Sequence, residues 1–261
     1  MFMTQPQPSG GFEWTQAPWG LALRCVPLEA IAPHVFTIGN LELRSREPEW
    51  QALAGAMGVP RDRLRLISQV HSADIAVIRR DGGSWTPPQA DGLVTDDGSV
   101  AIGVRVADCA PILIADRTRP AVAAVHAGWR GTMQRIAETA IRSLQDELGC
   151  DPRDLVAAIG PCLGPCCGEM GPEVVEMFAA AGHTPFTLQR WFTAGPSGRP
   201  YFDAWLANRD QLEQAGVPAD QIFSSDLCTK SHAPLFHSYR AQGAGTGRML
   251  GMIRAGVGER S

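Results

Sequence analysis

The chain has 261 residues, of which 44% are hydrophobic and 19% are charged, and its formal net charge at pH 7 is −4. This composition is typical of a globular protein; it argues against a membrane span, which needs roughly 18 consecutive apolar residues, and against a protein that binds nucleic acid through a basic surface. The seven cysteines lack the density of a secreted disulfide scaffold, so we expect free thiols in a cytoplasmic protein.

The first part of the chain consists of a polar start and two strand-like runs. Residues 1–15 are rich in Gly and Pro and lack the basic and apolar parts of a secretory signal, so we expect a flexible leader there. No linker divides the remainder, and residues 16–261 are expected to form a single domain. The runs 64–70 and 75–78 are typical of strands and lie on either side of His71.

The rest of the chain mixes strands and helices without a regular alternation, which favours the α+β class over a doubly wound sheet. One helix should end at Gly149, and another should be capped by Asp203 at its start. Strands are expected over residues 100–107, 111–116, 121–127, 155–159, 221–225, 235–239 and 248–253, and helices over 132–148, 172–181 and 203–214.

A hairpin is predicted where the short segment 117–120 turns one strand back onto the next. In the register that we expect, Pro111 faces His126 and Cys109 faces Gly128, so Cys109 and His126 lie diagonally on the same face of the sheet. A thiol next to an imidazole at a strand end is typical of either a metal site or a nucleophile–base pair. A single Cys or His in an apolar strand is more often a core residue, so the spacing alone leaves this choice open.

The tract HAGWRGT (126–132) indicates a possible anion site. Its glycines flank Trp129 and Arg130, and a helix is expected to begin at Thr132. Free backbone N–H groups at a helix start attract anions, and Arg130 could add a bidentate contact. A simple strand-to-helix turn with a solvated arginine explains the tract equally well.

Several motifs together resemble a known family. In chain order they are QVHSAD (69–74), ADGLVTD (90–96), RVADCAPILIAD (105–116), HAGWRGT (126–132), IGPCLGPCCGEMG (159–171) and FHSYRAQG…GR (236–248). This set resembles the bacterial YfiH-like family, also called the multicopper polyphenol oxidoreductase or laccase-domain family, from about residue 65 to the C-terminus.

The resemblance implies three metal ligands, His71, Cys109 and His126, which would also be catalytic. It implies an α+β fold like that of the cytotoxic necrotizing factor catalytic domain, with mixed β-sheets packed together and helices on the outside. Two features depart from the family pattern: Gly168 replaces the usual aromatic residue after the Cys pair, and residues 36–51 lack the usual GG-V-S start.

The ligand set must also decide which metal is expected. A multicopper oxidase needs many histidines, whereas this chain has six and no His-x-His pair, so we reject a multicopper centre. A His₂Cys set with an open fourth position suits catalytic zinc, and a single copper is the alternative.

The resemblance implies purine nucleoside phosphorylase activity on adenosine, inosine and methylthioadenosine, with adenosine deamination as a side activity. The substrates would be nucleoside and phosphate, and no obligate protein partner is expected. Asp108 and Glu169 are candidates for proton transfer or for orienting the ligands, and Arg130, Gly131 and Glu169 for substrate binding.

Three alternatives remain. The first is a copper-dependent polyphenol oxidase. The second is a metal-free hydrolase acting on cell-wall precursors, with Cys109 as nucleophile and His126 as base. The third is a binding protein without catalytic activity.

Overall fold

Two six-stranded mixed sheets form the body of the protein. The structure is a computed structural model that describes residues 5–44, 46–80, 85–196 and 198–256. The first sheet contains, in spatial order, β1 (Phe12–Ala17), β2 (Gly20–Cys25), β3 (His34–Thr37), β14 (Met249–Arg254), β7 (Ala101–Val106) and β4 (Leu64–Arg65). The second contains β13 (Ile222–Ser224), β10 (Leu155–Ile159), β8 (Ala110–Asp116), β9 (Val122–Ala127), β6 (Gly92–Thr95) and β5 (Ile75–Ile78).

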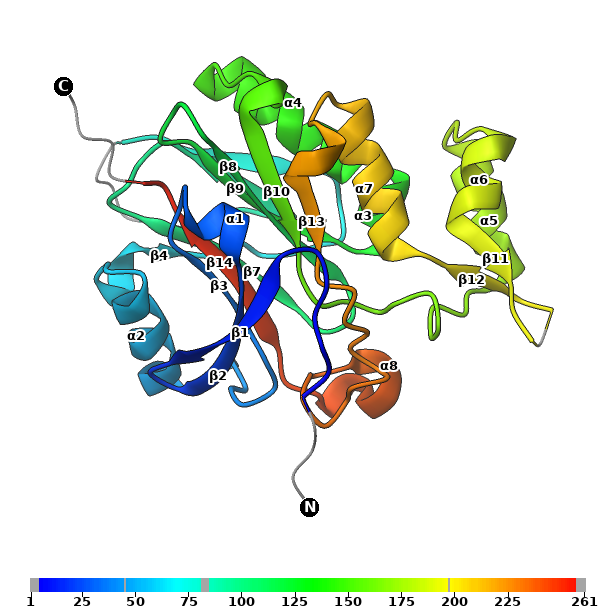
Figure 1. The fold of residues 1–261 in the computed structure, drawn as a ribbon, viewed down its shortest axis with the longest axis horizontal. Helices are drawn as coiled ribbons and strands as arrows, with labels where there is room; N and C mark the ends of the chain where they lie inside the picture. Colours follow the sequence, from blue (N-terminus) through cyan, green and yellow to red (C-terminus); the bar gives the residue numbers. More distant parts are fainter. Residues whose placement is uncertain (1–4, 45, 81–84, 197, 257–261) are drawn as a thin grey trace.

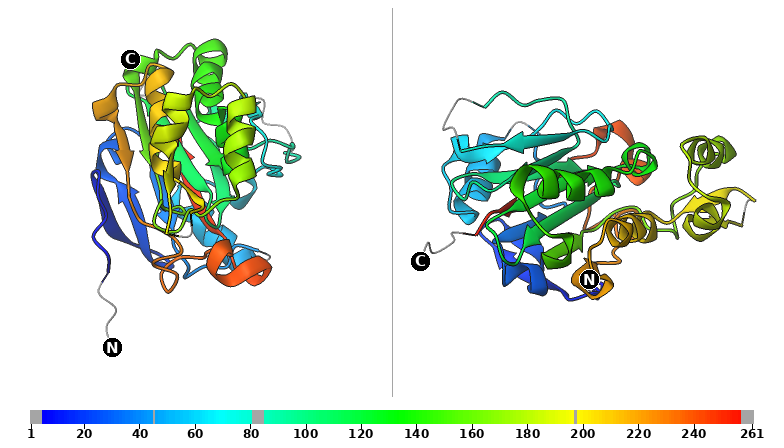
Figure 2. Two further views of the ribbon diagram at one scale, coloured as in Figure 1. Left: turned by 90° about the vertical axis from the view of Figure 1, so that its right-hand side faces the viewer. Right: turned by 90° about the horizontal axis from the view of Figure 1, so that it is seen from above.

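Helices flank the two sheets, so the predicted α+β class with mixed sheets is confirmed (Figure 1). A two-stranded ribbon, β11–β12, projects from one side of the body together with two of the helices, α5 and α6 (Figure 2). The bounds are α1 Val26–Glu29, α2 Glu47–Ala56, α3 Trp129–Met133, α4 Ile136–Leu148, α5 Pro172–Ala180, α6 Pro185–Trp191, α7 Ala204–Gln214, α8 Tyr239–Gln242, β11 Phe192–Ala194 and β12 Pro200–Phe202. None of the helices that the structure describes combines the length and the apolar character needed to cross a bilayer.

The central strand β8 shows how the layers pack. Its residues are buried throughout, but alternate side chains point to opposite faces. Ile112 and Ile114 belong to the core between the second sheet and helices α4 and α7, whereas Leu113 and Ala115 belong to the core between the two sheets. Helix α2 covers the outer face of the first sheet. The molecule therefore has helix, sheet, sheet and helix layers.

The predicted hairpin is confirmed in its register. Strands β8 and β9 are antiparallel, and Pro111 is paired with His126. The backbone N–H of Asp116 donates to the carbonyl of Ala121, as expected for the turn that was predicted. Cys109 lies immediately before β8, so this register brings its side chain to the end of β9 that carries His126.

Two predictions about the N-terminal half are wrong. Strand β1 begins at Phe12, inside the stretch predicted to be a leader, because it pairs with β2 and buries the Phe12 ring; residues 1–4 of that stretch lie outside the described part of the chain. The strand expected over 64–70 shrinks to Leu64–Arg65. After Arg65 the chain no longer pairs with β7, and the segment that follows brings His71 next to His126 of β9.

Two predictions about the C-terminal half are also wrong. The helix expected over 132–148 is divided, because Arg135 adopts a left-handed conformation with φ of 63° and donates hydrogen bonds to the carbonyls of Ala181 and Gly182. The strand expected over 235–239 is a turn that leads into α8, and its apolar character reflects burial of Phe236 rather than strand pairing.

Candidate active site

Three side chains from separate segments converge at one end of the second sheet. His71 lies in the connection between β4 and β5, Cys109 directly before β8, and His126 on β9. The ligand atoms of the three residues all lie within 4.8 Å of one another. The Cys109 Sγ is 4.0 Å from Nε2 of His71, and the two imidazole rings meet edge to face with their centroids 4.9 Å apart.

The local backbone is adapted to this convergence. His71 and Asp108 both have positive φ, 63° and 86°, a conformation that is uncommon for residues other than glycine and that clusters at functional sites. Gly128 leaves the space that the three side chains need. A Cβ at this position would lie 3.0 Å from the Cys109 Sγ and 3.1 Å from Cδ2 of His71.

A fully buried carboxylate, Asp91, fixes both histidines. Its Oδ1 accepts a hydrogen bond from Nδ1 of His126 at 2.7 Å, which leaves Nε2 of that ring free to bind a metal. Its Oδ2 accepts hydrogen bonds from the backbone N–H groups of Val70 and Ser72, at 3.1 and 2.6 Å. These residues flank His71, so one carboxylate positions both imidazoles.

The protonation states of these groups are strongly coupled. Burial alone would raise the pKa of Cys109, but the positive charge of His126 and hydrogen bonds from both histidines outweigh burial and lower it. Burial would likewise lower the pKa of His126, but the thiolate charge and the hydrogen bond to Asp91 raise it. For Asp91, the cost of burial is outweighed by its hydrogen bonds, so its pKa is lowered. Without a metal, the site therefore favours a thiolate–imidazolium pair.

The three residues fit a metal ion. Thiolate and imidazole are ligands that zinc prefers, and three protein ligands with an open fourth position are typical of catalytic zinc sites. The tautomer of His126 is fixed by a carboxylate, as is usual for metal-bound histidines. A cation would take the place of the protons that the thiolate and the two rings now share.

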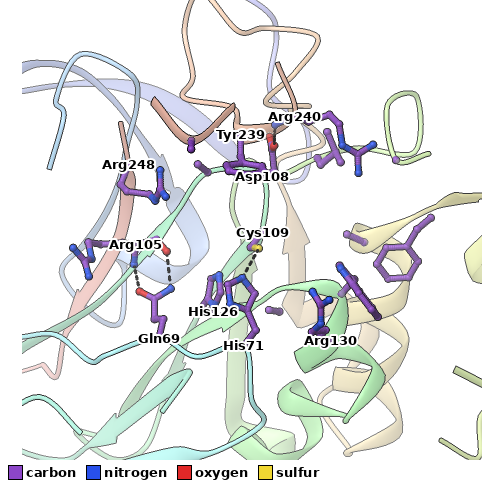
Figure 3. A pocket seen from close by; sticks show the side chains of 18 of the residues that line it. Gln69, His71, Arg105, Asp108, Cys109, His126, Arg130, Tyr239, Arg240 and Arg248 are labelled. Atoms are coloured by element: carbon purple, nitrogen blue, oxygen red, sulfur yellow. Dashed lines mark hydrogen bonds between the residues drawn. The ribbon is translucent and has the colours of Figure 1, made fainter. Parts of the chain in front are cut away.

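A cavity of about 940 Å³ opens over these side chains (Figure 3). Arg105 and Arg248 lie on one side of the candidate metal ligands and Arg130 lies on the other. Two more arginines, Arg44 and Arg240, also line the cavity, whereas Asp108 is the only acidic residue among its described lining residues. The cavity is thus cationic although the chain carries a net charge of −4.

Comparison with known proteins decides the family. Residues 45–256 match the family described as multi-copper polyphenol oxidoreductase laccase. The chain belongs to this family. The resemblance found in the sequence motifs is therefore confirmed.

Several similar proteins have names that describe purine nucleoside chemistry. The purine nucleoside phosphorylase YlmD of Geobacillus stearothermophilus is 36% identical over 217 residues, which cover 80% of this chain and 76% of that protein. Adenosine deaminase RL5, from an unknown prokaryotic organism, is 37% identical over 204 residues, or 75% of this chain and 76% of that protein. The crystal structure of YlmD from G. stearothermophilus superposes with a TM-score of 0.82 at 29% identity, over 95% of this chain and 99% of that chain. The laccase family thus includes enzymes named for purine nucleoside chemistry.

The structure brings Asp108 to the cavity, but both of its carboxylate oxygens are engaged. Oδ1 accepts a hydrogen bond from the Thr229 hydroxyl at 2.5 Å, and Oδ2 accepts one from the backbone N–H of Arg240 at 2.6 Å. Asp108 therefore anchors the start of α8, which carries two lining residues, Tyr239 and Arg240, into the cavity (Figure 3).

Of the three residues predicted to bind substrate, only Arg130 lines the cavity, where its guanidinium lies 4.2 Å from the centre of the Trp129 ring. Gly131 is buried inside α3, and a Cβ there would approach the carbonyl oxygen of Ser72 to 3.0 Å. The expected free amide of Thr132 is already bonded to the carbonyl of Gly128, so the helix start offers no anion site through it.

Glu169 is not among the lining residues. Its carboxylate accepts hydrogen bonds from the Arg199 guanidinium at 3.2 Å and the Tyr201 hydroxyl at 3.1 Å, and both partners belong to the region of the projecting ribbon. Gly168 stands where the family usually has an aromatic residue after the Cys pair. The fold leaves no room for a side chain there, because a Cβ would lie 2.3 Å from the carbonyl oxygen of Phe202.

Sequence reasoning did not assign roles to Asp91, Gln69, Arg105 and Arg248. The Gln69 side chain makes two 2.8 Å hydrogen bonds with the backbone of Arg105, and so ties the segment before His71 to β7 (Figure 3). Arg105 lies on β7, opposite Leu250 of β14, and Arg248 directly precedes β14. The pairing of these two strands therefore brings the two arginines close together. The four residues lie within the family motifs QVHSAD, ADGLVTD, RVADCAPILIAD and FHSYRAQG…GR, but their mutual positions depend on the three-dimensional fold.

Proposed function

We propose that this protein is a zinc-dependent purine nucleoside phosphorylase that acts on adenosine, inosine and methylthioadenosine, with adenosine deaminase side activity. The observation that carries the proposal is the position of the candidate zinc ligands between arginines in one cavity. Phosphorolysis needs a place for an anion next to a place for a nucleoside. The names of the relatives support the same chemistry.

The charge of the cavity supports phosphate as a substrate. Burial lowers the pKa of Arg105, and the positive charge of the neighbouring Arg248 lowers it further. In the described part of the chain, neither guanidinium forms an ion pair with a carboxylate. Two such cations favour an anion between them, and arginine binds phosphate in a bidentate geometry. We therefore assign phosphate to the side of the cavity that Arg105 and Arg248 line.

The size and the lining of the cavity support a nucleoside as the second substrate. Its volume of about 940 Å³ lies within the range of small-molecule sites. Apolar and aromatic side chains also line it, among them Leu163, Met170, Phe202 and Tyr239. Flat apolar surfaces of this kind can hold a purine base by stacking and burial.

Each residue at the centre then has a role that follows from its contacts. His71, Cys109 and His126 would hold the zinc ion, which supplies Lewis acidity to an oxygen of phosphate or water. Asp91 accepts a hydrogen bond from Nδ1 of His126, which directs Nε2 of that ring towards the ion. In phosphorolysis a phosphate oxygen forms a bond to C1′ of the ribose as the bond from C1′ to the purine breaks. The arginines hold the phosphate for this attack.

The remaining histidines do not support coupled copper centres. A ring nitrogen of each is hydrogen-bonded to a backbone carbonyl away from the candidate ligands: His34 to Ala32, His183 to Met133, His232 to Cys228 and His237 to Leu41. Two histidines and one cysteine are too few for the several coppers that a multicopper oxidase uses. A single copper ion in the same three ligands is the alternative metal.

A second candidate function rests on the contacts of Cys109. The lowered pKa of its thiol, with His126 beside it and Asp91 behind that histidine, is the arrangement of a cysteine nucleophile with an oriented base. On this basis the protein would be a metal-free hydrolase, and activity would survive removal of metal.

The deciding experiment follows the products of adenosine and inosine. With zinc and phosphate we expect adenine and hypoxanthine with ribose 1-phosphate, and inosine from adenosine without phosphate. A chelator should abolish both activities, and zinc should restore them. Cys109→Ala should be inactive, whereas Cys150→Ala, which removes a buried thiol elsewhere, should retain activity. Activity that persists with chelator but is lost on alkylation of Cys109 would favour the hydrolase, and phenol oxidation by a copper-loaded form alone would favour the oxidase.

A further inference from the structure

A second group of thiols lies outside the candidate zinc site. Strands β10 and β13 are parallel neighbours, so the loops that follow them both begin at the same end of the sheet, where the two strands finish. A parallel bridge between Cys162 and Cys228 extends this pairing beyond the strands. The loop after β10 then carries Cys166 and Cys167, and the fold brings both next to Cys228.

The sulfur atoms of these three residues converge. The Sγ atoms of Cys166, Cys167 and Cys228 all lie within 4.8 Å of one another, and those of Cys166 and Cys167 are 3.6 Å apart. The Ser231 hydroxyl lies 3.2 Å from the Sγ of Cys166 and 3.4 Å from that of Cys167. The backbone N–H of Gly164 donates a hydrogen bond to the Sγ of Cys228 at 3.3 Å.

We propose that Cys166, Cys167 and Cys228 bind a second, structural metal cation of the zinc class, with the Ser231 hydroxyl or a water molecule as fourth ligand. Three thiolates with one further ligand are a common structural zinc set. Zinc–sulfur bonds of ~2.3 Å in tetrahedral geometry place the sulfurs roughly 3.8 Å apart. The sulfurs of this cluster therefore need to move by little to reach that geometry.

The surroundings of the cluster suit such an ion. Each thiol gives up a proton to solvent on binding, and three thiolates with Zn²⁺ carry one net negative charge. The Arg240 guanidinium lies nearby and donates hydrogen bonds to the carbonyls of Cys167 and Glu169, at 3.2 and 2.9 Å. The graded exposure of the cluster, from exposed Cys166 to buried Cys228, gives an ion a path of entry.

The ion would hold together loops that line the cavity. The loop that carries Cys166 and Cys167 continues directly into the lining residue Gly168. On the other loop, the residue after Cys228 is Thr229, whose hydroxyl donates to Asp108. The cluster therefore lies where one cation can fix both sides of the cavity rim.

The test is the metal content of the reduced full-length protein after removal of metal and reloading with zinc. We expect about two zinc ions per chain in the parent, and about one each in Cys167→Ser and His126→Ala, because each variant removes a ligand of one site. Cys150→Ala, a buried cysteine elsewhere, should still bind about two. Because the two sites are removed separately, failure of the second site is distinguishable from failure of the proposed zinc enzyme.

Cobalt gives a second measurement that does not depend on folding of a cysteine variant. In His126→Ala loaded with Co²⁺, about three quarters of the sulfur-to-cobalt absorption should remain, since three of four ligating thiolates belong to the second site. Zinc should also raise the unfolding temperature of this variant. A parent with about one zinc per chain, unchanged in Cys167→Ser, would overturn the proposal. So would loss of nearly all sulfur-to-cobalt absorption in His126→Ala.

Discussion

Replacement of Asp91 by Asn is the sharpest test of how the candidate metal site is built. The carboxylate is fully buried and accepts on both sides, from His126 on Oδ1 and from the segment around His71 on Oδ2. An amide has the same shape but only one accepting oxygen. Whichever way the Asn side chain is turned, a donor then faces a donor on one side.

The expected loss of metal affinity follows from these two orientations. If the amide nitrogen faces His126, that ring must accept at Nδ1 and carry its proton on Nε2, the atom that a metal needs. If it faces the other way, the N–H groups of Val70 and Ser72 lose their acceptor, which costs about 1–3 kcal/mol. Substitutions behind metal ligands typically cost 10–100-fold in affinity, or about 1.4–3 kcal/mol. Since neither orientation of the introduced amide is satisfied, we expect a loss of zinc affinity at the upper end of this range, about 100-fold.

The measurement is competition for zinc between the protein and a chelator of known affinity. Asp97→Asn is the matched control, because Asp97 is also buried but accepts a hydrogen bond from Ser99 N–H that Asn can accept as well. In Asp91→Asn the zinc-dependent activity should fall in proportion to the fraction of protein that has zinc bound, and it should recover in part when the zinc concentration is raised. A folded Asp91→Asn protein that binds zinc as tightly as the parent would refute the assigned role.

Three further predictions follow from the same structure. Gly128→Ala should weaken zinc binding at least ~10-fold in the same competition assay, because its Cβ would lie 3.0 Å from the Cys109 Sγ, whereas Gly55→Ala has no neighbour within 4 Å and should leave binding unchanged. Arg105→Ala should raise the KM for phosphate about 10-fold or more in phosphorolysis, with zinc content and the KM for nucleoside little changed; equal phosphate dependence in variant and parent would count against this anion site. Burial lowers the pKa of His34 to about 4, against about 6.5 in the unfolded chain, so its contribution to stability is complete above pH 6.5 and is lost as the pH falls towards 4. Across that interval the parent should lose about 3 kcal/mol more of its free energy of unfolding than His34→Gln, measured by denaturant unfolding.

The hairpin and its two site residues could be predicted because they depend on local rules. A short turn between two apolar strands fixes the register, and the register places Cys109 beside His126. The third ligand, His71, followed only from resemblance, since nothing in the spacing links the connection after β4 to β9. What links them in the structure is Asp91, a buried carboxylate between segments that are distant in sequence.

The cationic side of the cavity could not be predicted for a related reason. Strands β7 and β14 are paired although they lie far apart in the sequence, and the pairing of Arg105 with Leu250 puts Arg248 at the diagonal position. Glu169 was predicted to take part in proton transfer or substrate binding, but it is not among the residues that line the cavity. The chain turns there towards the projecting ribbon, where Arg199 and Tyr201 bind its carboxylate.

The arrangement around Cys109 favours a metal over a nucleophile. A cysteine nucleophile needs one base, and His126, oriented by Asp91, would be sufficient. His71 approaches the same sulfur to 4.0 Å from a separate segment, in a backbone conformation with positive φ, and lowers the pKa of the thiol together with His126, although one base is enough for a nucleophile. Three ligands, by contrast, are what a catalytic metal site requires. Asp91 holds the segments of both histidines at once, and Gly128 leaves open the space in which all three side chains meet. A second imidazole held in this backbone conformation is a required ligand in the proposed metal site, whereas the hydrolase needs only His126 as its base.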